Sequence, residues 1–435
     1  MIKTKIQSFI NKNGLLLLII VAFIFRMGFF VSLRPWDENV INKTILIDDA
    51  TGYNRMALGI LNEKSFDSLG SIRTPGYPLF LAICYLFFGE TIWITLLLQI
   101  FISLLTLLFT YKITVECCSK RIALLTIFLL AFDYHQAGLA ISLVTETLFI
   151  FLLVLAIYYL ILGLKQKRGL FIILSGFFLG LATLTRPISF LFPVVTILFI
   201  ICFFIIFNKD YTYIPKLKII GKYVFWHLII YLIVLSPWIL RNYLIYQELK
   251  LTSISGLNLL FYNVTITEAE RSGLTYTEAR SYFMEEAYKS GCDTSEIHSF
   301  NNSRIYSKIA KNYIRNNFLL YCRSHLKGMV NLFYNVDRFE QLKTLSGFIK
   351  YKTIGFLIFF AIIYFFAVFG IILSIKKKYP DSILFLLIIL YFDVITGVIG
   401  DPRFQVPIMP YIYIFCSIGI SLLYDKVKWK VFNIN

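Results

Sequence analysis

The sequence contains little charge. Asp, Glu, Lys and Arg make up 15% of its 435 residues, whereas soluble globular proteins contain about 25% of these residues. Apolar residues make up 58%, which excludes an ordinary soluble domain and a disordered chain. Histidine and cysteine are also sparse. The four histidines and seven scattered cysteines show no metal-ligand spacing, and a disulfide scaffold is excluded as well.

What the sequence contains instead is a series of long apolar runs. Runs of roughly 17–25 residues are long enough to cross a bilayer as helices. Leu79–Gly89 is shorter and is predicted to be an interfacial or re-entrant helix, while Pro187 should divide one longer run into two helices. We therefore predict an all-α polytopic membrane protein with about ten transmembrane helices, near residues 14–33, 91–115, 122–138, 143–164, 170–185, 187–207, 223–240, 353–375, 382–399 and 405–424.

The distribution of basic residues predicts the orientation of these helices. Lysine and arginine collect in cytoplasmic loops, and the loop at 131–142 contains neither. Both termini are therefore expected to be cytoplasmic, and much of the net charge of +17 is explained without nucleic acid. The predicted cytoplasmic segments, each with two to four Lys or Arg residues, are 1–12, 116–121, 165–168, 208–222, 376–381 and 425–435.

Two polar segments are expected on the outer side of the membrane. The first is the loop at 34–78, and the second is the segment at 241–352, whose patterns predict amphipathic helices. This divides the chain into a transmembrane module at 1–240, the exterior segment, and C-terminal transmembrane helices at 353–435. Cys292 and Cys322 lie in the second exterior segment and could pair in an oxidising compartment.

The first exterior loop contains the strongest candidate for a catalytic group. Asp49, Tyr53 and Ala57 are spaced four residues apart, which places them on one face of a helix at the membrane boundary. Asp48 precedes Asp49, and the alternative is that this acidic pair only caps the helix. Glu146 is a second carboxylate, predicted near the outer end of a span, where an ionisable group is costly to bury. A capping role is its alternative.

Arginines are predicted at the same outer level. They are Arg73, Arg186, Arg241 and Arg403. A guanidinium group suits bidentate binding of a phosphate, although any single one could simply extend to the membrane interface. Four arginines opposite two carboxylates indicate an anionic lipid head group presented to a general base.

The order of these motifs resembles a known superfamily. An Asp-x3-Tyr-x3-Ala loop follows the first span, and later come Thr-Glu-Thr-Leu-Phe, Gly-Leu-Ala-Thr-Leu-Thr-Arg-Pro, Pro-Trp-x2-Arg-Asn-Tyr and Arg-Phe-x-Val-Pro. Between them lies the turn Arg-x-Pro-Gly-Tyr-Pro, which includes Tyr77. The chain resembles the GT-C superfamily of polytopic glycosyltransferases, in the branch of protein O-mannosyltransferases and ArnT-like aminoarabinose transferases.

The resemblance implies a membrane hexosyl- or pentosyltransferase. Such an enzyme moves a sugar, with inversion, from a polyprenyl-phosphate donor to an acceptor hydroxyl of a lipid, glycan or protein on the outer face of a bacterial plasma membrane. It implies Asp49 as the base with Asp48 as the fallback, and Glu146 as the second acidic position. A divalent cation is a candidate cofactor, with the metal requirement open. The implied substrate-binding residues are Tyr53, Arg73, Tyr77, Arg186, Arg241 and Arg403, of which Arg403 is expected to bind the donor phosphate.

Two alternatives remain open at this point. A flippase or transporter of lipid-linked sugars would also have many spans and outer arginines, but the sequence shows no repeat of the kind that two-halved transporters contain. A membrane polymerase of glycan chains is the other alternative. Release of polyprenyl phosphate from a lipid-linked sugar would identify the transferase.

Overall fold

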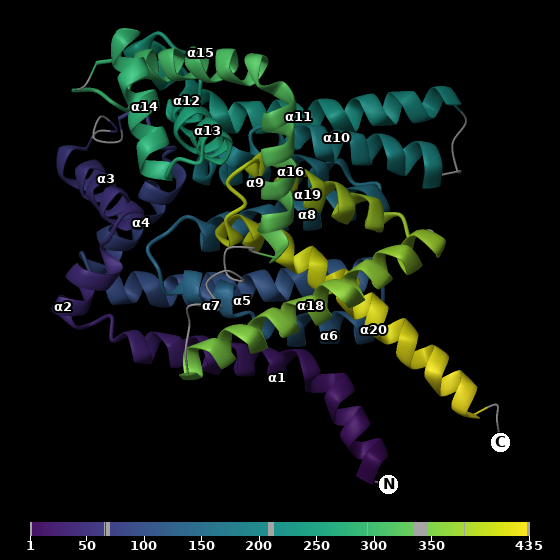
Figure 1. Ribbon diagram of the computed structural model, residues 1–435. Coiled ribbons are helices and arrows are strands. Elements are labelled where there is room, and N and C mark those ends of the chain that lie inside the picture. The colour runs from purple at the N-terminus through teal and green to yellow at the C-terminus, as the bar shows by residue number, and fades with distance from the viewer. Residues whose placement is uncertain are drawn as a thin grey trace.

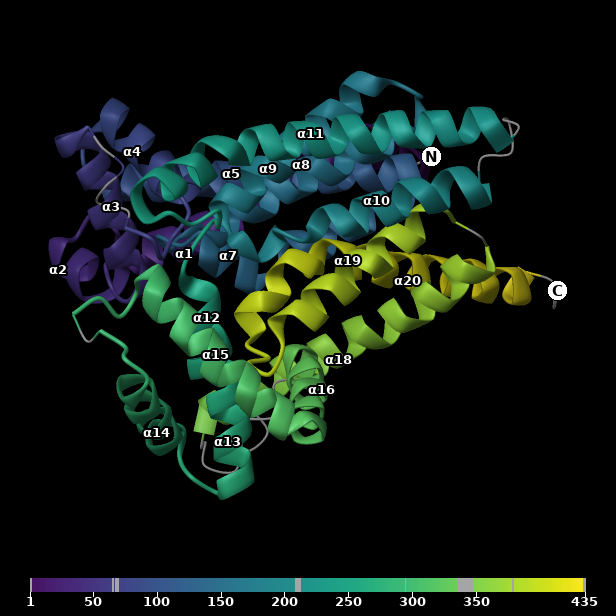
Figure 2. The same cartoon turned by 90° about the horizontal axis from the view of Figure 1, so that it is seen from above.

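The structure is a computed structural model that describes residues 2–432, except 65, 67–69, 208–212, 294, 335–346 and 378. Within these residues the chain forms helices and no strands. The longest helices lie side by side, and α2, α3 and α4 gather at one end of this bundle (Figure 1). Helices α12 to α16 form a separate group beside the bundle (Figure 2). The predicted all-α class is confirmed.

The helices fall into three groups by their place in the structure. The bundle consists of α1 (Ile2–Leu33), α5 (Ile92–Cys117), α6 (Lys120–Ala131), α8 (Glu146–Lys165), α9 (Gly169–Thr185), α10 (Phe192–Cys202), α11 (Tyr213–Tyr246), α18 (Gly347–Lys376), α19 (Asp381–Thr396) and α20 (Met409–Phe432). Short helices at its ends are α2 (Glu38–Val40), η1 (Ile41–Ile45), α3 (Asp49–Glu63), α4 (Gly76–Phe88), α7 (Tyr134–Ala140), η3 (Pro187–Ser189), η4 (Phe203–Phe207) and η6 (Pro402–Ile408). The group beside the bundle contains α12 (Ile254–Asn258), η5 (Leu259–Val264), α13 (Thr265–Ser272), α14 (Tyr276–Lys289), α15 (Phe300–Asn316) and α16 (Phe318–Tyr334).

Each of the ten predicted spans lies in a helical segment, but they differ in length. Among the described residues, seven helices are long and apolar enough to cross a membrane, and α6 with α7 adds an eighth if this pair, bent by 60°, is one span. The other two predicted spans are α9, with 17 residues, and α19, with 16. About ten is therefore an approximate count, and the protein is an integral multi-pass membrane protein.

Proline and glycine set several of these boundaries. Arg186, which precedes Pro187, is extended at φ −139° and ψ 115°, so α9 ends at Thr185 as expected. Leu79–Gly89, predicted to be an interfacial or re-entrant helix, falls in the 13-residue apolar helix α4. That helix ends at Phe88, and the residue that follows it, Gly89, has a φ of +68°, which suits a residue without a Cβ.

The most buried helices lie in the centre of the bundle. In α8, 78% of the apolar stretch is buried inside the protein, and in the span Arg403–Asp425, which consists of most of η6 and the first part of α20, the share is 83%. Helix α8 packs against α5 and α9, while α20 packs against α6 and α18. In contrast, the apolar stretch within Asn13–Leu33 of α1 is 22% buried, which leaves most of its apolar surface free to face lipid. The first residue of α8 therefore lies at the end of a deeply buried helix.

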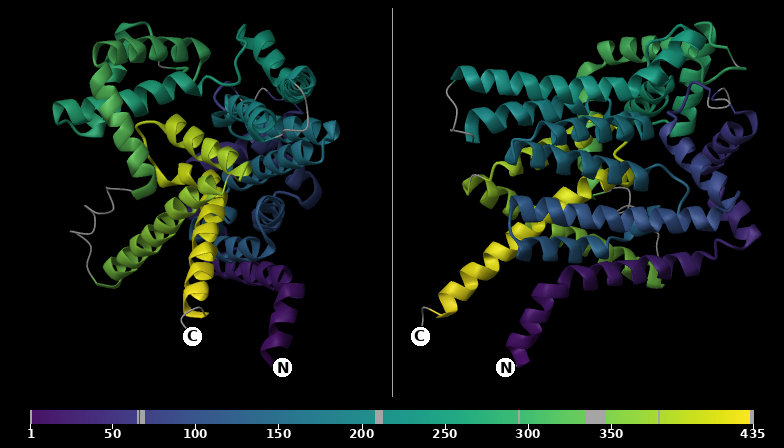
Figure 3. Two further views of the ribbon diagram at one scale, coloured as in Figure 1. Left: turned by 90° about the vertical axis from the view of Figure 1, so that its right-hand side faces the viewer. Right: turned by 180° about the vertical axis from the view of Figure 1, so that it is seen from behind.

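Four of the segments predicted to be cytoplasmic, 116–121, 165–168, 376–381 and 425–435, meet at one end of the bundle. Lys165 Nζ lies 2.7 Å from Asp381 and donates to the carbonyl of Glu116 at 2.6 Å. Arg121 forms an ion pair with Asp425 at 2.7 Å. Both termini lie at the end away from α2, α3 and α4, as opposite views show (Figures 1 and 3). The predicted site residues are found at the other end.

Candidate active site

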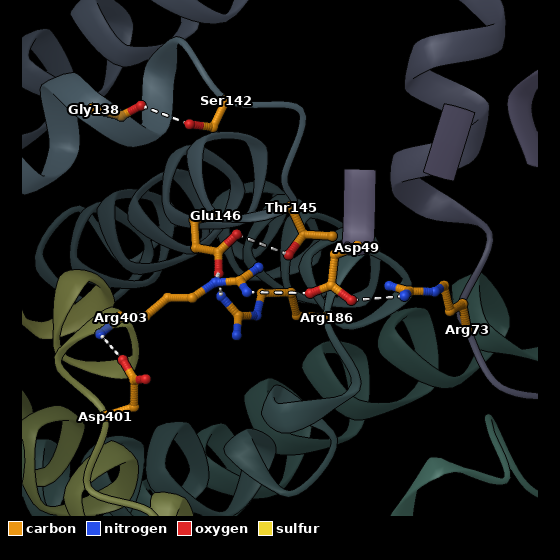
Figure 4. Close-up of polar contacts among 9 residues, drawn as sticks. All are labelled: Asp49, Arg73, Gly138, Ser142, Thr145, Glu146, Arg186, Asp401 and Arg403. Atoms are coloured by element: carbon orange, nitrogen blue, oxygen red, sulfur yellow. Dashed lines mark hydrogen bonds and ion pairs between the residues drawn. The ribbon is translucent and has the colours of Figure 1, made fainter. Parts of the chain in front are cut away.

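A carboxylate at the start of α3 joins two arginines from distant parts of the chain. Arg73 lies in the turn before α4, and its NH2 is 2.7 Å from Asp49 Oδ1. Arg403 lies in η6, immediately before α20, and its NH1 is 3.1 Å from Asp49 Oδ2. The two carboxylate oxygens therefore each have a guanidinium partner (Figure 4).

A second carboxylate continues this network. Glu146 is the first residue of α8 and accepts a hydrogen bond from Nε of Arg403. Its Oε1 is also 2.6 Å from NH1 of Arg186, which directly follows α9. Arg403 therefore lies between Asp49 and Glu146 and contacts both (Figure 4). The arginine–carboxylate cluster is defined as Arg73, Asp49, Arg403, Glu146 and Arg186.

The two carboxylates of the cluster differ in their exposure. The side chain of Asp49 is 41% exposed, whereas that of Glu146 is 0% exposed. Burial alone would raise the pKa of Asp49, but the hydrogen bond and charge of Arg73, together with Arg403, hold it below its ordinary value. Asp49 is therefore ionised at neutral pH and is the carboxylate that a substrate can reach.

The arginines outnumber the acids in this cluster. Three guanidinium groups and two carboxylates leave one formal positive charge, so the cluster favours an added anion. Arg403 is 34% exposed, and Arg186 is 12% exposed. Arg186 also lies 5.5 Å from the ring centre of Phe404 and 5.7 Å from that of Phe149, which shields its charge from water. Arg403 is the more accessible of the two.

Tyr53 lies one helical turn after Asp49 and lines the same face of α3. The guanidinium group of Arg73 lies 4.2 Å from the centre of its ring, a cation–π distance. Burial raises the pKa of Tyr53, so its phenol is neutral. The predicted helical spacing therefore brings Tyr53 into contact with an arginine of the cluster.

Three other predicted residues lie outside the arginine–carboxylate cluster. Asp48 has a φ of +47° and precedes α3, but its side chain forms no capping hydrogen bond. Tyr77 is fully buried and donates to Gln99 Oε1 at 2.8 Å. Arg241 donates to the carbonyls of Phe66 and Gly70 at 3.0 and 2.9 Å. Its guanidinium group therefore holds the first polar loop rather than the cluster.

Gln99 was not among the predicted site residues. It lies in α5, is fully buried, and donates to the carbonyls of Ala140 and Ser142 at 3.3 and 2.8 Å. These carbonyls belong to the segment that leads into α8, so Gln99 positions the backbone before Glu146. A glutamine inside an otherwise apolar span is the signal that could have identified it.

The donor set of the cluster does not fit a divalent cation. Within the part of the chain that the structure describes, no three His, Cys, Asp or Glu side chains gather in a way that could hold a metal ion. The two carboxylates of the cluster are joined by Arg403, and a cation between them would face three guanidinium groups. No step is therefore assigned to a metal.

The cysteines of the second polar segment are unpaired thiols in the structure. Cys292 is buried, and its Sγ lies 3.2 Å from the hydroxyl of Tyr306. Cys322 is also a free cysteine. The pairing considered from the sequence is therefore not formed.

The chain is similar in fold to several solved structures, and part of its sequence matches one protein family. AglB, the oligosaccharyltransferase of Archaeoglobus fulgidus, in complex with an inhibitory peptide and a dolichol-phosphate, matches 98% of the chain with a TM-score of 0.58 and 13% identity. The structure of the Archaeoglobus fulgidus oligosaccharyltransferase in the apo form also matches 98% of the chain, with a TM-score of 0.58 and 15% identity. The chain spans about half, 52%, of the length of each.

These matches define the class by its fold: this is a polytopic membrane protein with the GT-C fold. Residues 72–240 of the chain match the family described as dolichyl-phosphate-mannose-protein mannosyltransferase. ArnT from Cupriavidus metallidurans, bound to undecaprenyl phosphate, matches 90% of this chain and 78% of its own, at 12% identity and a TM-score of 0.43. No curated protein sequence matches the chain.

Proposed function

We propose that the protein is a glycosyltransferase that moves a sugar from a polyprenyl-phosphate donor to an acceptor hydroxyl with inversion. The observation that carries this proposal is the accessible carboxylate of Asp49, which lies between Arg73 and Arg403. A base and an anion-binding group must lie side by side for this chemistry. The family matched at 72–240, and the dolichol-phosphate bound to AglB, support the same donor class.

In the proposed reaction the acceptor oxygen attacks the anomeric carbon of the donor sugar. The bond between that carbon and the phosphate oxygen breaks, the acceptor proton passes to Asp49, and polyprenyl phosphate leaves with both electrons of the broken bond. Because phosphate is a good leaving group, no strong general acid is required. This distinguishes the site from a glycosidase, in which a carboxylic acid protonates the leaving oxygen.

The arginines bind the donor phosphate in this proposal. Arg403 is the main candidate because it is partly exposed and has a planar group suited to phosphate. Glu146 and Arg186 act as positioning residues, since Glu146 is fully buried and contacts Arg403. A phosphate that attracts Arg403 or Arg73 weakens their hold on Asp49. The pKa of Asp49 then rises, and its carboxylate becomes a better base.

The end of the bundle that contains the cluster is proposed to face outward from a bacterial plasma membrane. Basic residues gather in the segments at the opposite end, which fits a cytoplasmic location for that end. The bilayer supplies the lipid-linked donor, and the acceptor is a lipid, glycan or protein. The inhibitory peptide bound to AglB makes a peptide one acceptor class to examine. The transferred group is a hexosyl or pentosyl unit.

The deciding experiment incubates the purified protein with a panel of polyprenyl-phosphate sugars and candidate acceptors. Release of polyprenyl phosphate and an acceptor glycoside of inverted anomeric configuration, determined by NMR, are the expected result. Movement of intact donor across a proteoliposome membrane without release would instead identify a flippase or transporter. A product that lengthens by repeated additions would identify a glycan polymerase.

A further inference from the structure

A basic cavity lies outside the arginine–carboxylate cluster. It has a volume of about 510 Å³ and is open to solvent. It is lined by residues of α15, by Ser255 in α12 and by Lys250 in the segment that joins α11 to α12. Helices α12 and α15 lie side by side in the group beside the bundle (Figure 2). Its principal polar side chains are those of Lys250, Ser255, Arg304, Ser307, Lys308 and Lys311.

The packing of α15 fixes which of its side chains face the cavity. Arg304, Lys308 and Lys311 follow one another at helical spacing, so they share one face. The opposite face contains Tyr306 and Ile309, which are buried against α12 and η5. Because the apolar face is held by this core, the basic face is held towards the cavity.

The cavity has more positive than negative charge. Glu248 pairs with Lys250 at 3.0 Å and with Arg304 at 2.5 Å. No acidic side chain in the described ranges pairs with Lys308 or Lys311. Four basic groups therefore face one acid, and the local charge of about three units favours a multiply charged anion.

The cavity is linked to the loop that contains Arg73. Ser253 lies between Lys250 and Ser255, and its backbone N–H donates to the carbonyl of Ser71 at 2.8 Å. The hydroxyls of Ser71 and Ser253 both donate to the carbonyl of His298, at 2.8 and 2.5 Å. Lys250 and Ser255, which line the cavity, are therefore close in sequence to Ser253, which is hydrogen-bonded to the loop that contains Arg73.

We infer that this cavity is a second anion site, which binds the phosphate of a lipid head group other than the donor. Lysine, arginine and serine side chains supply the charge and hydrogen bonds that phosphate oxygens accept. A volume of 510 Å³ lies within the range of small-molecule sites and exceeds what one phosphate needs, so a larger phosphorylated head group fits. This inference goes beyond the proposed transferase activity and does not depend on it.

The test measures binding to the full-length purified protein in a neutral detergent by isothermal titration. The probes are dioctanoyl phosphatidic acid, dioctanoylglycerol, which lacks the phosphate, and inorganic phosphate. The paired variant Lys308→Gln with Lys311→Gln removes two charges and retains helix propensity. We expect it to weaken binding of the phosphatidic acid at least about tenfold, as for the loss of two charge-assisted contacts. The glycerolipid should not bind.

The matched control removes two basic charges that do not line the cavity, by Lys289→Gln and Arg315→Gln. This control should bind phosphatidic acid as the unmodified protein does. Equal weakening in both variants, or none in the first, overturns the site. Inorganic phosphate that binds as tightly as the lipid assigns the cavity to a soluble phosphate and overturns the lipid assignment. Release of polyprenyl phosphate, measured alongside, reports separately on the proposed function.

Discussion

At the scale of single residues, Asp49 and Glu146 show how one functional group can serve two purposes. Asp49 is 41% exposed, while Glu146 is 0% exposed, although both contact Arg403. A fully buried carboxylate without a basic partner would be costly in free energy. The arginines therefore stabilise Glu146 inside the protein, and they leave Asp49 in contact with the space where a substrate could bind.

Replacement of Asp49 by asparagine tests its proposed role as the base. Asparagine is similar in size but cannot accept a proton at neutral pH. General-base catalysis contributes about 10²–10⁴ in rate, so kcat in the donor-release assay should fall at least about a hundredfold. Asp48→Asn is the control, because Asp48 contacts none of the cluster arginines in the described contacts. An active Asp49→Asn protein would contradict the assignment.

Replacement of Arg73 tests how the pKa of Asp49 is set. Arg73 lowers this pKa through a hydrogen bond and through its charge. Arg73→Gln should therefore raise it towards its ordinary value, so the acid limb of the pH profile of kcat/KM should move to higher pH. Arg55→Gln, on the same helix as Asp49, is the control and should leave the limb in place. An unmoved limb in Arg73→Gln would assign that titration to another group.

Replacement of Arg403 by lysine separates charge from geometry. The guanidinium group contacts Glu146 through Nε and Asp49 through NH1, and a single ammonium group cannot reproduce this fork. Donor affinity should fall in Arg403→Lys while the protein remains folded, as measured by equilibrium binding of the lipid donor and by thermal unfolding. Unchanged donor affinity in Arg403→Ala would transfer the proposed role to Arg73 or Arg186.

The sequence predicts the members of this cluster better than their contacts. Asp49, Arg73, Glu146, Arg186 and Arg403 could each be selected as a charged group near the outer end of an apolar run. Their pairing could not be predicted, because it depends on where η6 and α3 lie relative to α8. For the same reason, the attachment of Arg241 to backbone carbonyls was not visible from its motif. Side-chain partners are a tertiary property.

At the scale of helices, the contact between α4 and α9 determines where two of the arginines lie. A Cβ added to Gly76, the first residue of α4, would lie 2.6 Å from the carbonyl oxygen of Leu184 in α9. Arg73 precedes this contact by three residues, and Arg186 follows it by two. Close approach of the two backbones therefore brings both arginines to the same end of the bundle.

Gly76→Ala tests this contact. Because the added methyl group meets backbone rather than a movable side chain, overpacking should lower the free energy of unfolding by about 1–3 kcal/mol. Thermal unfolding in detergent measures the loss. The control is Gly28→Ala in α1, where nothing lies within 4 Å of the added Cβ. There, alanine should be neutral or stabilising, so equal losses in both variants would contradict the packing argument.

At the scale of the whole molecule, polar contacts show which segments of the chain lie together at each end of the bundle. Lys165 joins the segments at 116–121 and 376–381, which the charge pattern predicts to be cytoplasmic. Arg121 adds the C-terminal segment through Asp425. The predicted orientation depends on the number of spans, and α9 and α19, with 17 and 16 residues, are shorter than the roughly 20 residues of a typical span. The contacts fix which segments share an end, which a hydropathy pattern does not supply.

Cysteine labelling in intact cells tests the orientation. A cysteine introduced at Ser299, which precedes α15, should react with a membrane-impermeant reagent from outside. A cysteine at Lys377, beyond α18, should react only after the membrane is opened. The unmodified protein corrects for its seven native cysteines. Labelling of position 377 from outside would reverse the orientation and the proposed location of the site.

The position of Arg403 late in the chain has a consequence for biosynthesis. Glu146 and Asp49 leave the ribosome more than 250 residues before this arginine, since the separations are 257 and 354 residues. Before Arg403 is synthesised, the cluster partners already present in the chain are Arg186 for Glu146 and Arg73 for Asp49. The two half-sites join only when η6 arrives. The proposed site is therefore incomplete in a nascent chain that ends before η6.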